Sequence, residues 1–217
     1  MPKVLVSDKL SPCAAKIFRE RGVHVDVKPG LSSDELLNII GDYDGLAIRS
    51  ATKVTEEVLD AAANLKVVGR AGIGIDNVDI GAATKRGVIV MNTPHGNSVT
   101  TAEHAITMIL ALARQIPEAN TSTKAGKWEK SGFMGTEITG KTLGLIGCGN
   151  IGIIVAERAQ GLKMRVVGYD PYLSSENAKR LGIEKLELND LLKRADFITL
   201  HTPLTDATRN IISADAL

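Results

Sequence analysis

The sequence predicts an α/β fold with two parallel sheets, one in each half of the chain. First, short β-branched runs alternate with capped helical segments, as is typical of a parallel sheet covered by helices on both faces. Second, this alternation stops near residues 92–94 and begins again at residue 142. Third, 217 residues suffice for one large domain or two small ones. We therefore expect two α/β domains, residues 1–94 and residues 95–217.

Each element of the first half has a local signal in the sequence. Ser11 and Pro12 suit the N-cap and first position of a helix, and Gly22 ends it. Ser32 and Glu35 form a capping box for a second helix, and Thr55 caps a third. The expected strands between and after these helices are 3–7, 23–27, 46–48, 67–68 and 88–90.

The second half begins with one long helix, expected over residues 100–116 and capped by Thr100 with Glu103. Apolar residues lie nearly all round it, so we expect it to be buried, for example between domains or subunits. A loop over residues 126–140 holds the only tryptophan, Trp128, and Asn189 is the expected cap of a later short helix. The remaining expected elements are strands 142–146, 165–169 and 197–200 and a helix over 150–162.

Composition excludes several classes of function. The net charge is +1 and only 3% of residues are aromatic, which argues against a nucleic-acid surface. No apolar run approaches the roughly 20 residues that span a bilayer, and the N-terminus lacks a signal-peptide core. Cys13 and Cys148 lie too far apart in sequence to suggest a disulfide framework or a metal site. We expect a cytoplasmic protein that binds no metal, membrane or nucleic acid.

The stretch GLIGCGNIG places three glycines, Gly147, Gly149 and Gly152, in the pattern G-x-G-x-x-G. Taken alone the pattern can be an ordinary turn, but here a strand precedes it, an amphipathic helix follows, and a second strand ends at Asp170. The glycines would allow the tight turn, the approach of a pyrophosphate and close helix packing, while the helix N-terminus attracts the phosphates. Asp170 would accept hydrogen bonds from a ribose diol and repel a 2′-phosphate, which predicts NAD rather than NADP.

Two further features are weaker candidates. A second glycine run, Gly72 and Gly74 in RAGIGIDN, lacks the third glycine, so we interpret it as a turn at a strand end. Arg49 and Arg70 follow expected strands of the first half, at the sheet edge where ligands bind, and their guanidinium groups suit a carboxylate or phosphate. The alternative for each arginine is a surface salt bridge.

The chain resembles the D-2-hydroxyacid dehydrogenases, and within them the branch that acts on phosphoglycerate. The resemblance extends over almost the whole chain. The stretches that carry it are IRSATKVT (48–55), KVVGRAGIGIDNVDI (66–80), VMNTPHGNS (90–98), ARQIPEA (113–119), GKWEKSGFMGTEITGKTLGLIGCGNIG (126–152), GYDPY (168–172) and ADFITLHTPLTDATRNII (195–212).

The resemblance implies a flavodoxin-like substrate domain over residues 1–94 and a C-terminally incomplete Rossmann NAD-binding domain over residues 95–217. It implies oxidation of 3-phospho-D-glycerate to 3-phosphohydroxypyruvate with NAD, the first step of L-serine biosynthesis. It also implies a homodimer or homotetramer whose contacts include the long helix and the Trp128 loop.

The resemblance assigns site residues by position. Asn97 would join the two arginines at the substrate, and Ile73 stands where relatives often carry threonine near the nicotinamide. The cofactor-binding residues that it implies or that the glycine pattern predicts are Ile73, Gly147, Gly149, Asn150, Ile151, Gly152, Asp170, Thr202 and Pro203.

No catalytic residue is expected within this chain. The reaction needs a group that accepts the hydroxyl proton, yet His24, His95, His104 and His201 do not match the family's catalytic histidine. The resemblance implies that this histidine, its glutamate and an essential arginine follow residue 217, and a complete dinucleotide domain needs two more strands there. We therefore expect the 217 residues alone to be inactive.

Three alternatives remain open at this point. The protein could be a glyoxylate or hydroxypyruvate reductase of the same family, because the shared signature covers these enzymes. It could be a non-enzymatic NAD-sensing protein of the corepressor type. It could also be a structural remnant that binds no ligand.

Overall fold

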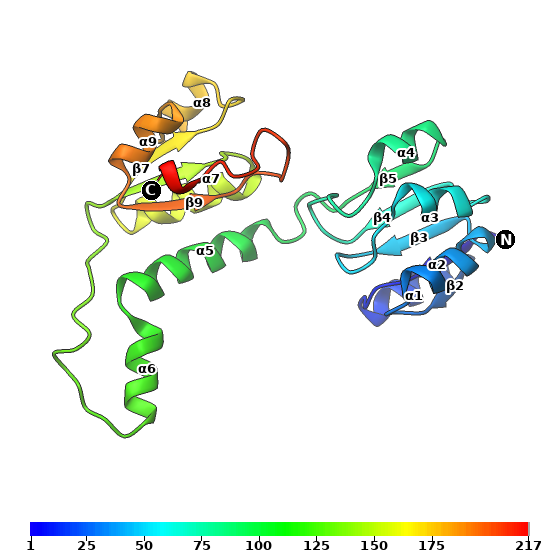
Figure 1. The fold of residues 1–217 in the computed structure, drawn as a ribbon, viewed down its shortest axis with the longest axis horizontal. Helices are drawn as coiled ribbons and strands as arrows, with labels where there is room; N and C mark the ends of the chain where they lie inside the picture. The colour runs from blue at the N-terminus through cyan, green and yellow to red at the C-terminus, as the bar shows by residue number, and fades with distance from the viewer. Residues whose placement is uncertain (217) are drawn as a thin grey trace. The chain divides into compact units, whose positions relative to one another are not determined.

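The computed structural model describes residues 1–216 and divides the chain into two compact units, Met1–Asn97 and Ser98–Leu217. Both are α/β units with a wholly parallel sheet, as the alternation of the sequence predicted (Figure 1). The sequence placed the division at residues 94 and 95, three residues before the end of the first unit.

The first unit has a five-stranded sheet in the order β2-β1-β3-β4-β5, the order of flavodoxin-like folds. Its elements are β1 (Lys3–Val6), α1 (Pro12–Glu20), β2 (His24–Val27), α2 (Ser33–Ile39), a 3₁₀ turn (Ile40–Asp42), β3 (Gly45–Ile48), α3 (Glu56–Ala61), β4 (Val67–Arg70), α4 (Ile80–Lys85) and β5 (Ile89–Met91). One hydrophobic core joins the central strands to α2, α3 and α4 through side chains such as Leu5, Leu36, Val58, Val68 and Ala83.

The caps of the first unit follow the sequence signals. The Ser32 hydroxyl accepts the N–H of Glu35 at 3.2 Å, and the Glu35 carboxylate accepts the N–H of Ser32 at 2.8 Å, so the predicted capping box is confirmed. Thr55 caps α3 as predicted. Helix α4 was not predicted. It begins where Asp79 accepts the N–H of Ala82 at 2.8 Å.

The second unit has a four-stranded sheet in the order β8-β7-β6-β9. Its elements are α5 (Ser98–Ala113), α6 (Ile116–Lys124), β6 (Thr142–Ile146), α7 (Asn150–Gly161), β7 (Arg165–Tyr169), α8 (Ser175–Arg180), β8 (Glu184–Lys185), α9 (Leu188–Arg194), β9 (Phe197–Leu200) and a terminal 3₁₀ turn (Ala214–Ala216). Numbered within the unit, the order is 3-2-1-4, which is part of the Rossmann order 3-2-1-4-5-6.

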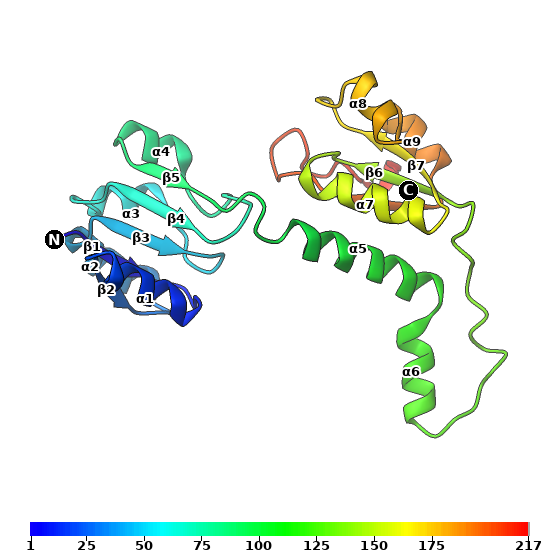
Figure 2. The ribbon, with the colours of Figure 1, turned by 180° about the vertical axis from the view of Figure 1, so that it is seen from behind.

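Helices cover both faces of this second sheet (Figures 1 and 2). Successive residues of β6 point to opposite faces, because a strand has a side-chain period of two. Leu143 and Leu145 pack with α5 and α7, whereas Ile146 packs with Leu191 of α9. The strands β6 and β7 are therefore buried on both sides, which explains their continuous apolar runs.

The predicted long helix is wrong in two respects. It begins at Ser98, so Thr100 is not its cap, and it ends at Ala113 because Gln115 adopts a left-handed φ of 51°. A separate helix, α6, starts at Ile116. Pro117 explains the break, since proline fits the first turn of a helix but lacks the N–H that a helix interior requires.

Within this chain, helix α5 is buried on one face only. Ala102, Ile106 and Ile109 are buried against the core, but Leu112 is 73% exposed and Met108 is 57% exposed. Burial of the other face between subunits stays a prediction.

Three features near the end of the chain differ from the sequence predictions. Helix α9 begins after Glu187, so Asn189 lies inside the helix and is not its cap. Helix α8 and the two-residue strand β8 were not predicted, because both are short and polar. Glu184 of β8 forms a two-bond ion pair with Arg194 at 2.6 and 2.8 Å.

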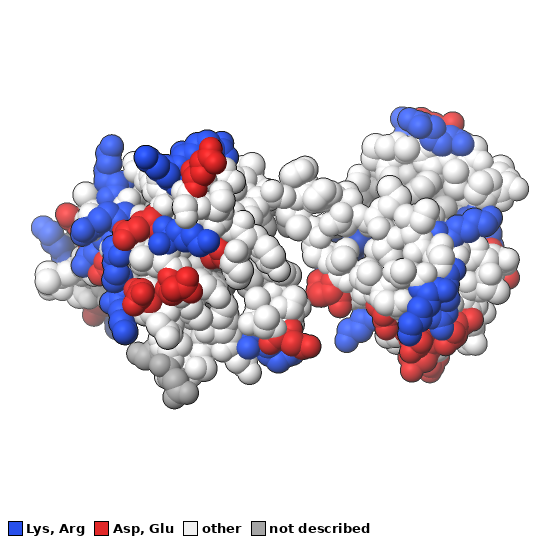
Figure 3. All heavy atoms as spheres, turned by 90° about the horizontal axis from the view of Figure 1, so that it is seen from above, with Lys and Arg blue, Asp and Glu red and all other residues white. Residues whose placement is uncertain are grey.

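The surface carries mixed charge. On the face drawn in Figure 3, basic and acidic side chains lie interspersed, in keeping with the net charge of +1. Within residues 1–216, none of the helices combines the length and the apolar character needed to cross a membrane.

Candidate functional site

The turn between β6 and α7 requires glycine at its first position. Gly147 has a φ of +92°, a left-handed conformation that other residues adopt only with strain. A Cβ atom there would lie 2.6 Å from the carbonyl oxygen of His201 and 2.9 Å from the methyl group of Thr202. The end of β9 therefore closes tightly over this turn, and no side chain fits between them.

The other two glycines of the pattern have different surroundings. A Cβ at Gly152 would collide with the carbonyl oxygen of Gly147, so this glycine lets the first turn of α7 pass against the loop itself. A Cβ at Gly149 would meet no atom within 4 Å. Gly149 is thus the residue whose missing side chain leaves open space.

This open space suits a pyrophosphate. Gly149 is the N-cap of α7 and supplies no side-chain hydrogen bond, so first-turn N–H groups of the helix remain free to bind an anion. Asn150 and Ile151 occupy that first turn. The loop therefore has the features that the sequence assigned to a dinucleotide cradle.

Asp170 follows β7 directly and has a structural role besides the predicted one. Its Oδ2 accepts the N–H of Cys148 at 2.7 Å, and its Oδ1 accepts the N–H of Tyr172 at 2.8 Å. A carboxylate has about four lone-pair sites, so acceptor capacity remains for a ribose. The residue predicted to bind the cofactor thus also fixes the middle of the glycine turn, which the sequence did not reveal.

The end of β9 supplies the other wall of the site. Thr202 lies against Gly147, and the Pro203 carbonyl accepts the Thr208 hydroxyl at 2.5 Å. Strands β7 and β9 flank β6 on opposite sides, so this is the switch point where α/β sheets bind ligands. The structure brings eight predicted residues together here: Gly147, Gly149, Asn150, Ile151, Gly152, Asp170, Thr202 and Pro203.

Two ionisable groups border the turn. The Cys148 thiol is buried, and burial, with a smaller contribution from the Asp170 charge, raises its pKa to about 12. The thiol is therefore protonated at neutral pH. The His201 ring lies 3.0 Å from the Thr199 hydroxyl, and burial lowers the pKa of its imidazole.

In the first unit, both predicted arginines stand at the carboxyl edge of the sheet. Arg49 follows β3 and is exposed, whereas Arg70 ends β4 with a side chain only 10% exposed. The Arg70 Nε donates to the Arg49 carbonyl at 3.1 Å, and its Nη2 lies 3.7 Å from Asp76 Oδ1. Arg70 is therefore held in a fixed orientation, while the Arg49 guanidinium faces solvent.

The remaining predicted residues of this unit lie in loops. The Ile73 carbonyl accepts the side-chain N–H of Asn92 at 2.7 Å, and the Gly72 carbonyl accepts the N–H of Thr93 at 3.0 Å. The turn after β4 is thus tied to the end of β5. Asn97 is exposed in the turn that precedes α5.

Two residues near the arginines were missed by the sequence reasoning. Asp8 is the second residue after β1, and Asn77 lies between the turn after β4 and α4. Both hydrogen-bond the backbone of residues 49–52. The available signal was the position of Asp8 near the carboxyl end of its strand, which resembles that of Asp170 after β7.

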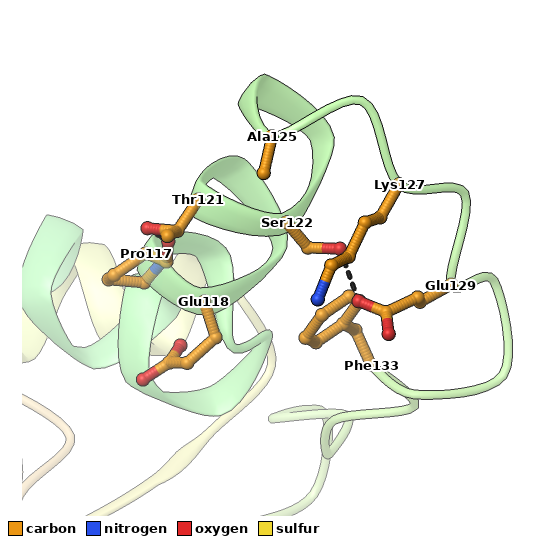
Figure 4. A pocket seen from close by; sticks show the side chains of 8 residues that line it. All are labelled: Pro117, Glu118, Thr121, Ser122, Ala125, Lys127, Glu129 and Phe133. Carbon is orange, nitrogen blue, oxygen red and sulfur yellow. Dashed lines mark hydrogen bonds between the residues drawn. The ribbon is translucent and has the colours of Figure 1, made fainter.

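A separate hollow lies on α6 and the segment that follows it (Figure 4). The Lys127 N–H donates to the Ser122 carbonyl at 3.1 Å, and the Ser122 hydroxyl contacts the Glu129 carboxylate at 2.5 Å, so this segment folds back on the helix. Lys127, Glu129 and Phe133 line one side of the hollow. It contains none of the predicted site residues.

No group of three or more histidine, cysteine, aspartate or glutamate side chains with metal-binding geometry occurs in the part of the chain that the structure describes.

The comparison with protein families identifies the second unit. Residues 106–217 match the model of the D-isomer specific 2-hydroxyacid dehydrogenase NAD-binding domain, which is about half of the chain. The chain belongs to the D-2-hydroxyacid dehydrogenase family. NAD is the cofactor of its second unit, in agreement with the prediction from the glycine turn and Asp170.

Curated relatives extend the similarity to the first unit. D-3-phosphoglycerate dehydrogenase of Pongo abelii is 52% identical over 211 residues, which is 97% of this chain and 40% of the relative. The protein of the same name from Synechocystis is 48% identical over 217 residues. The chain thus spans about 40% of the length of the curated relatives that it matches.

Solved structures share both the fold and the cofactor. Cofactor (NAD+)-bound 3-phosphoglycerate dehydrogenase of Entamoeba histolytica is 32% identical, with a TM-score of 0.78 over 95% of this chain and 64% of that one. The D-lactate dehydrogenase of Aquifex aeolicus, complexed with NAD and lactic acid, is 26% identical, with a TM-score of 0.84 over 95% and 62% of the two chains.

The two open glycines of α7 provide a matched test of the dinucleotide site. Gly149→Ala and Gly161→Ala each add one methyl group, and neither Cβ would meet an atom within 4 Å. We expect both variants to fold. Gly149→Ala should weaken NADH binding at least about tenfold, because its methyl group occupies the pyrophosphate space. Calorimetric titration with NADH measures this, and equal affinities for the two variants would contradict the assignment.

Burial of Cys148 predicts selective alkylation. Cys13 is exposed, so iodoacetamide at neutral pH should label it within minutes, whereas Cys148 should stay unlabelled until the protein unfolds. Mass spectrometry of the native and urea-treated protein gives the sites and extents of labelling. Cys13→Ser isolates the second thiol, and rapid labelling of that variant without denaturant would show that the glycine turn opens.

Proposed function

We propose that this chain forms part of an NAD-dependent dehydrogenase that oxidises 3-phospho-D-glycerate to 3-phosphohydroxypyruvate, the first step of L-serine biosynthesis. The proposal rests on the share of the chain that is similar to known relatives. Curated relatives named D-3-phosphoglycerate dehydrogenase match 97% of the chain, so the likeness includes the first unit as well as the NAD-binding domain. Residues 1–94 would then be the substrate-binding part, and residues 95–217 the cofactor-binding part.

The first unit supplies groups suited to such a substrate. Phosphoglycerate carries a carboxylate and a phosphate, and guanidinium groups bind both through paired charge-assisted hydrogen bonds. Arg70 would be the buried anchor, since main-chain and carboxylate contacts hold its side chain, and Arg49 would bind from an exposed position. Asn97 would add a neutral hydrogen-bonding group.

In the second unit, the proposed cofactor contacts follow the geometry of the turn. Gly149 and the first turn of α7, with Asn150 and Ile151, would hold the pyrophosphate, and Asp170 the adenosine ribose. Thr202 and Pro203 would border the adenine. NAD, when bound, accepts the hydride from the carbon that bears the hydroxyl group. Ile73 has no side-chain hydrogen-bond donor, so it would offer the nicotinamide only its main-chain groups and its apolar side chain.

Proton transfer is assigned to none of the four histidines of this chain. His24 begins β2 and lies 3.3 Å from Asp26, at the amino edge of the sheet, whereas Arg49 lies at the carboxyl edge. His201 is hydrogen-bonded to Thr199, and His95 and His104 are exposed. We propose that the acceptor of the hydroxyl proton belongs to the part of the relatives' length that these 217 residues do not span.

A second copy of the chain is the proposed partner. Exposed apolar side chains gather on α5, on α6 and on the segment that follows: Met108, Leu112, Ile116, Trp128 and Met134. Trp128 is 85% exposed, which is unusual for a large aromatic side chain and is typical of interface positions. We further propose a cytoplasmic location, which is consistent with two free thiols.

Substrate profiling tests the proposed reaction. The protein at its full natural length should reduce NAD with 3-phosphoglycerate and discriminate strongly against lactate and glycerate, which lack the phosphate. Arg70→Ala should raise the KM for phosphoglycerate about a hundredfold, because charge-assisted hydrogen bonds are lost. Arg86→Ala is the control, since Arg86 of the same unit pairs with Asp60 and Glu56. NADH absorbance measures the rates.

Other outcomes of this assay favour other functions. Faster turnover of glyoxylate or hydroxypyruvate with NADH would replace the proposed reaction with that of a reductase. Binding of NADH without turnover of any 2-hydroxy acid would instead indicate a non-enzymatic NAD-binding protein.

A charge on α5 tests the proposed self-association. Leu112→Glu should shift the protein from dimer or tetramer toward monomer, because the carboxylate would be desolvated in the contact. Ile17→Glu, which introduces the same charge at a 48% exposed position of α1, should leave the assembly unchanged. Light scattering of both variants gives the masses. A wild-type protein that is monomeric at micromolar concentration would refute the proposal.

A further inference from the structure

Asp8 is a buried carboxylate at the carboxyl end of β1. It is only 5% exposed, and it lies where β1 and β3 adjoin in the sheet order β2-β1-β3-β4-β5. This is the topological switch point of a flavodoxin-like sheet, the place where such sheets bind ligands. Arg49, at the end of the neighbouring strand β3, stands at the same edge.

The Asp8 carboxylate binds both ends of the loop that carries Arg49. Its Oδ2 accepts the Arg49 N–H at 2.5 Å, and its two oxygens lie 3.2 and 3.3 Å from the Thr52 N–H. Its Oδ1 also accepts the Thr52 hydroxyl at 2.8 Å. The Ser7 hydroxyl lies 2.9 Å from the Thr52 hydroxyl and completes the cluster.

The carbonyl groups of the same loop are fixed by two other side chains, those of Asn77 and Arg70. Asn77 Nδ2 donates to the Arg49 carbonyl at 2.8 Å and to the Thr52 carbonyl at 2.7 Å. The Arg49 carbonyl also accepts the Arg70 Nε at 3.1 Å. The main chain of Arg49 therefore connects the buried carboxylate, through its N–H, to the guanidinium of Arg70, through its carbonyl.

The electrostatics of Asp8 are unusual for a buried charge. Across residues 1–216, no lysine, arginine or histidine nitrogen lies within 4.0 Å of its carboxylate. Only N–H and O–H donors stabilise the negative charge. Burial of a charge without a cationic partner costs free energy. If the loop needed only one hydrogen bond, an asparagine at this position would supply it without that cost.

We propose that Asp8 is a positioning residue for the anionic substrate. Its carboxylate fixes the backbone of residues 49–52, which places the Arg49 side chain and gives Arg70 its main-chain acceptor. Two anion-binding side chains on different strands are then oriented by one buried charge. A binding site needs such rigid support, because the residues behind the ligand contacts hold the contacting side chains in place. The inference rests on the proposed substrate role of Arg49 and Arg70.

Asp8→Asn tests the proposal in the full-length protein. An amide keeps the shape but turns a donor group toward the N–H of Arg49 or Thr52, so one contact becomes repulsive. We expect the KM for 3-phosphoglycerate to rise about tenfold, with kcat and the KM for NAD changed by less than about twofold. Hydrogen exchange of the Arg49 and Thr52 amides should accelerate in the same variant, which reports on the loop without reference to activity.

Thr52→Val is the second variant. It removes the hydroxyl that donates to Asp8 and contacts Ser7 but keeps the main-chain N–H contacts to Asp8, so it should raise the same KM by a smaller factor. Asp44→Asn is the matched control. Asp44 accepts the Lys3 N–H at 2.9 Å at the opposite edge of the same sheet, so its loss should leave the substrate KM unchanged.

The outcomes separate this inference from the proposed function. If the wild type does not oxidise phosphoglycerate, the proposed function fails and the inference falls with it. If the wild type is active but Asp8→Asn and Thr52→Val keep its KM, only the positioning role of Asp8 is overturned. If the KM rises equally in Asp8→Asn and in Asp44→Asn, the positioning role is also overturned, and Asp8 contributes only to general stability.

Discussion

The interaction on which both sheets depend is an aspartate carboxylate that accepts a main-chain N–H from a neighbouring segment. At the amino edges, Asp44 directly precedes β3 and binds the first residue of β1, and Asp196 directly precedes β9 and binds the first residue of β6. At the carboxyl edges, Asp8 follows β1 and Asp170 follows β7, and each holds the loop after an adjacent strand. The two units thus use the same device at both ends of their sheets. At the carboxyl ends it fixes the loops that face ligands.

Local signals predicted most of the fold, and the failures have physical causes. The capping box at Ser32 depends on residues three apart, so the sequence alone identifies it. The break between α5 and α6 depends on Gln115, a left-handed residue that is not glycine and carries no sequence signature of its own. Within one chain α5 is buried on one face only, and composition cannot distinguish a face packed on the sheet from a face available to another molecule. Residues such as Leu112 belong to the second kind.

In the candidate site, too, some residues were predictable from the sequence and others were not. The glycine turn and Asp170 were predictable, because their spacing along the chain reflects one strand-turn-helix-strand unit. The arginines were predictable as residues at strand ends. Asp8 was not, since its partners Arg49 and Thr52 are 41 and 44 residues away and only the strand order makes them neighbours. The sequence therefore predicted the candidate ligand contacts, and it did not predict the residue that holds the loop behind two of them.

The surroundings of the glycines in and near the turn after β6 decide where glycine-to-alanine substitution can make this protein more heat-stable. Glycine widens the unfolded ensemble, so replacing it with alanine at a compatible site adds about 0.4–1 kcal/mol of stability. In the turn after β6 this route is closed by backbone conformation at Gly147 and by collision at Gly152, and the proposed pyrophosphate contact would close it at Gly149. Gly161, in the same helix as Gly152, is free of all three restrictions. Gly161 is therefore a position where alanine can raise thermal stability. The glycines of the turn have to be kept, so the conformational entropy that they add to the unfolded chain cannot be removed by substitution.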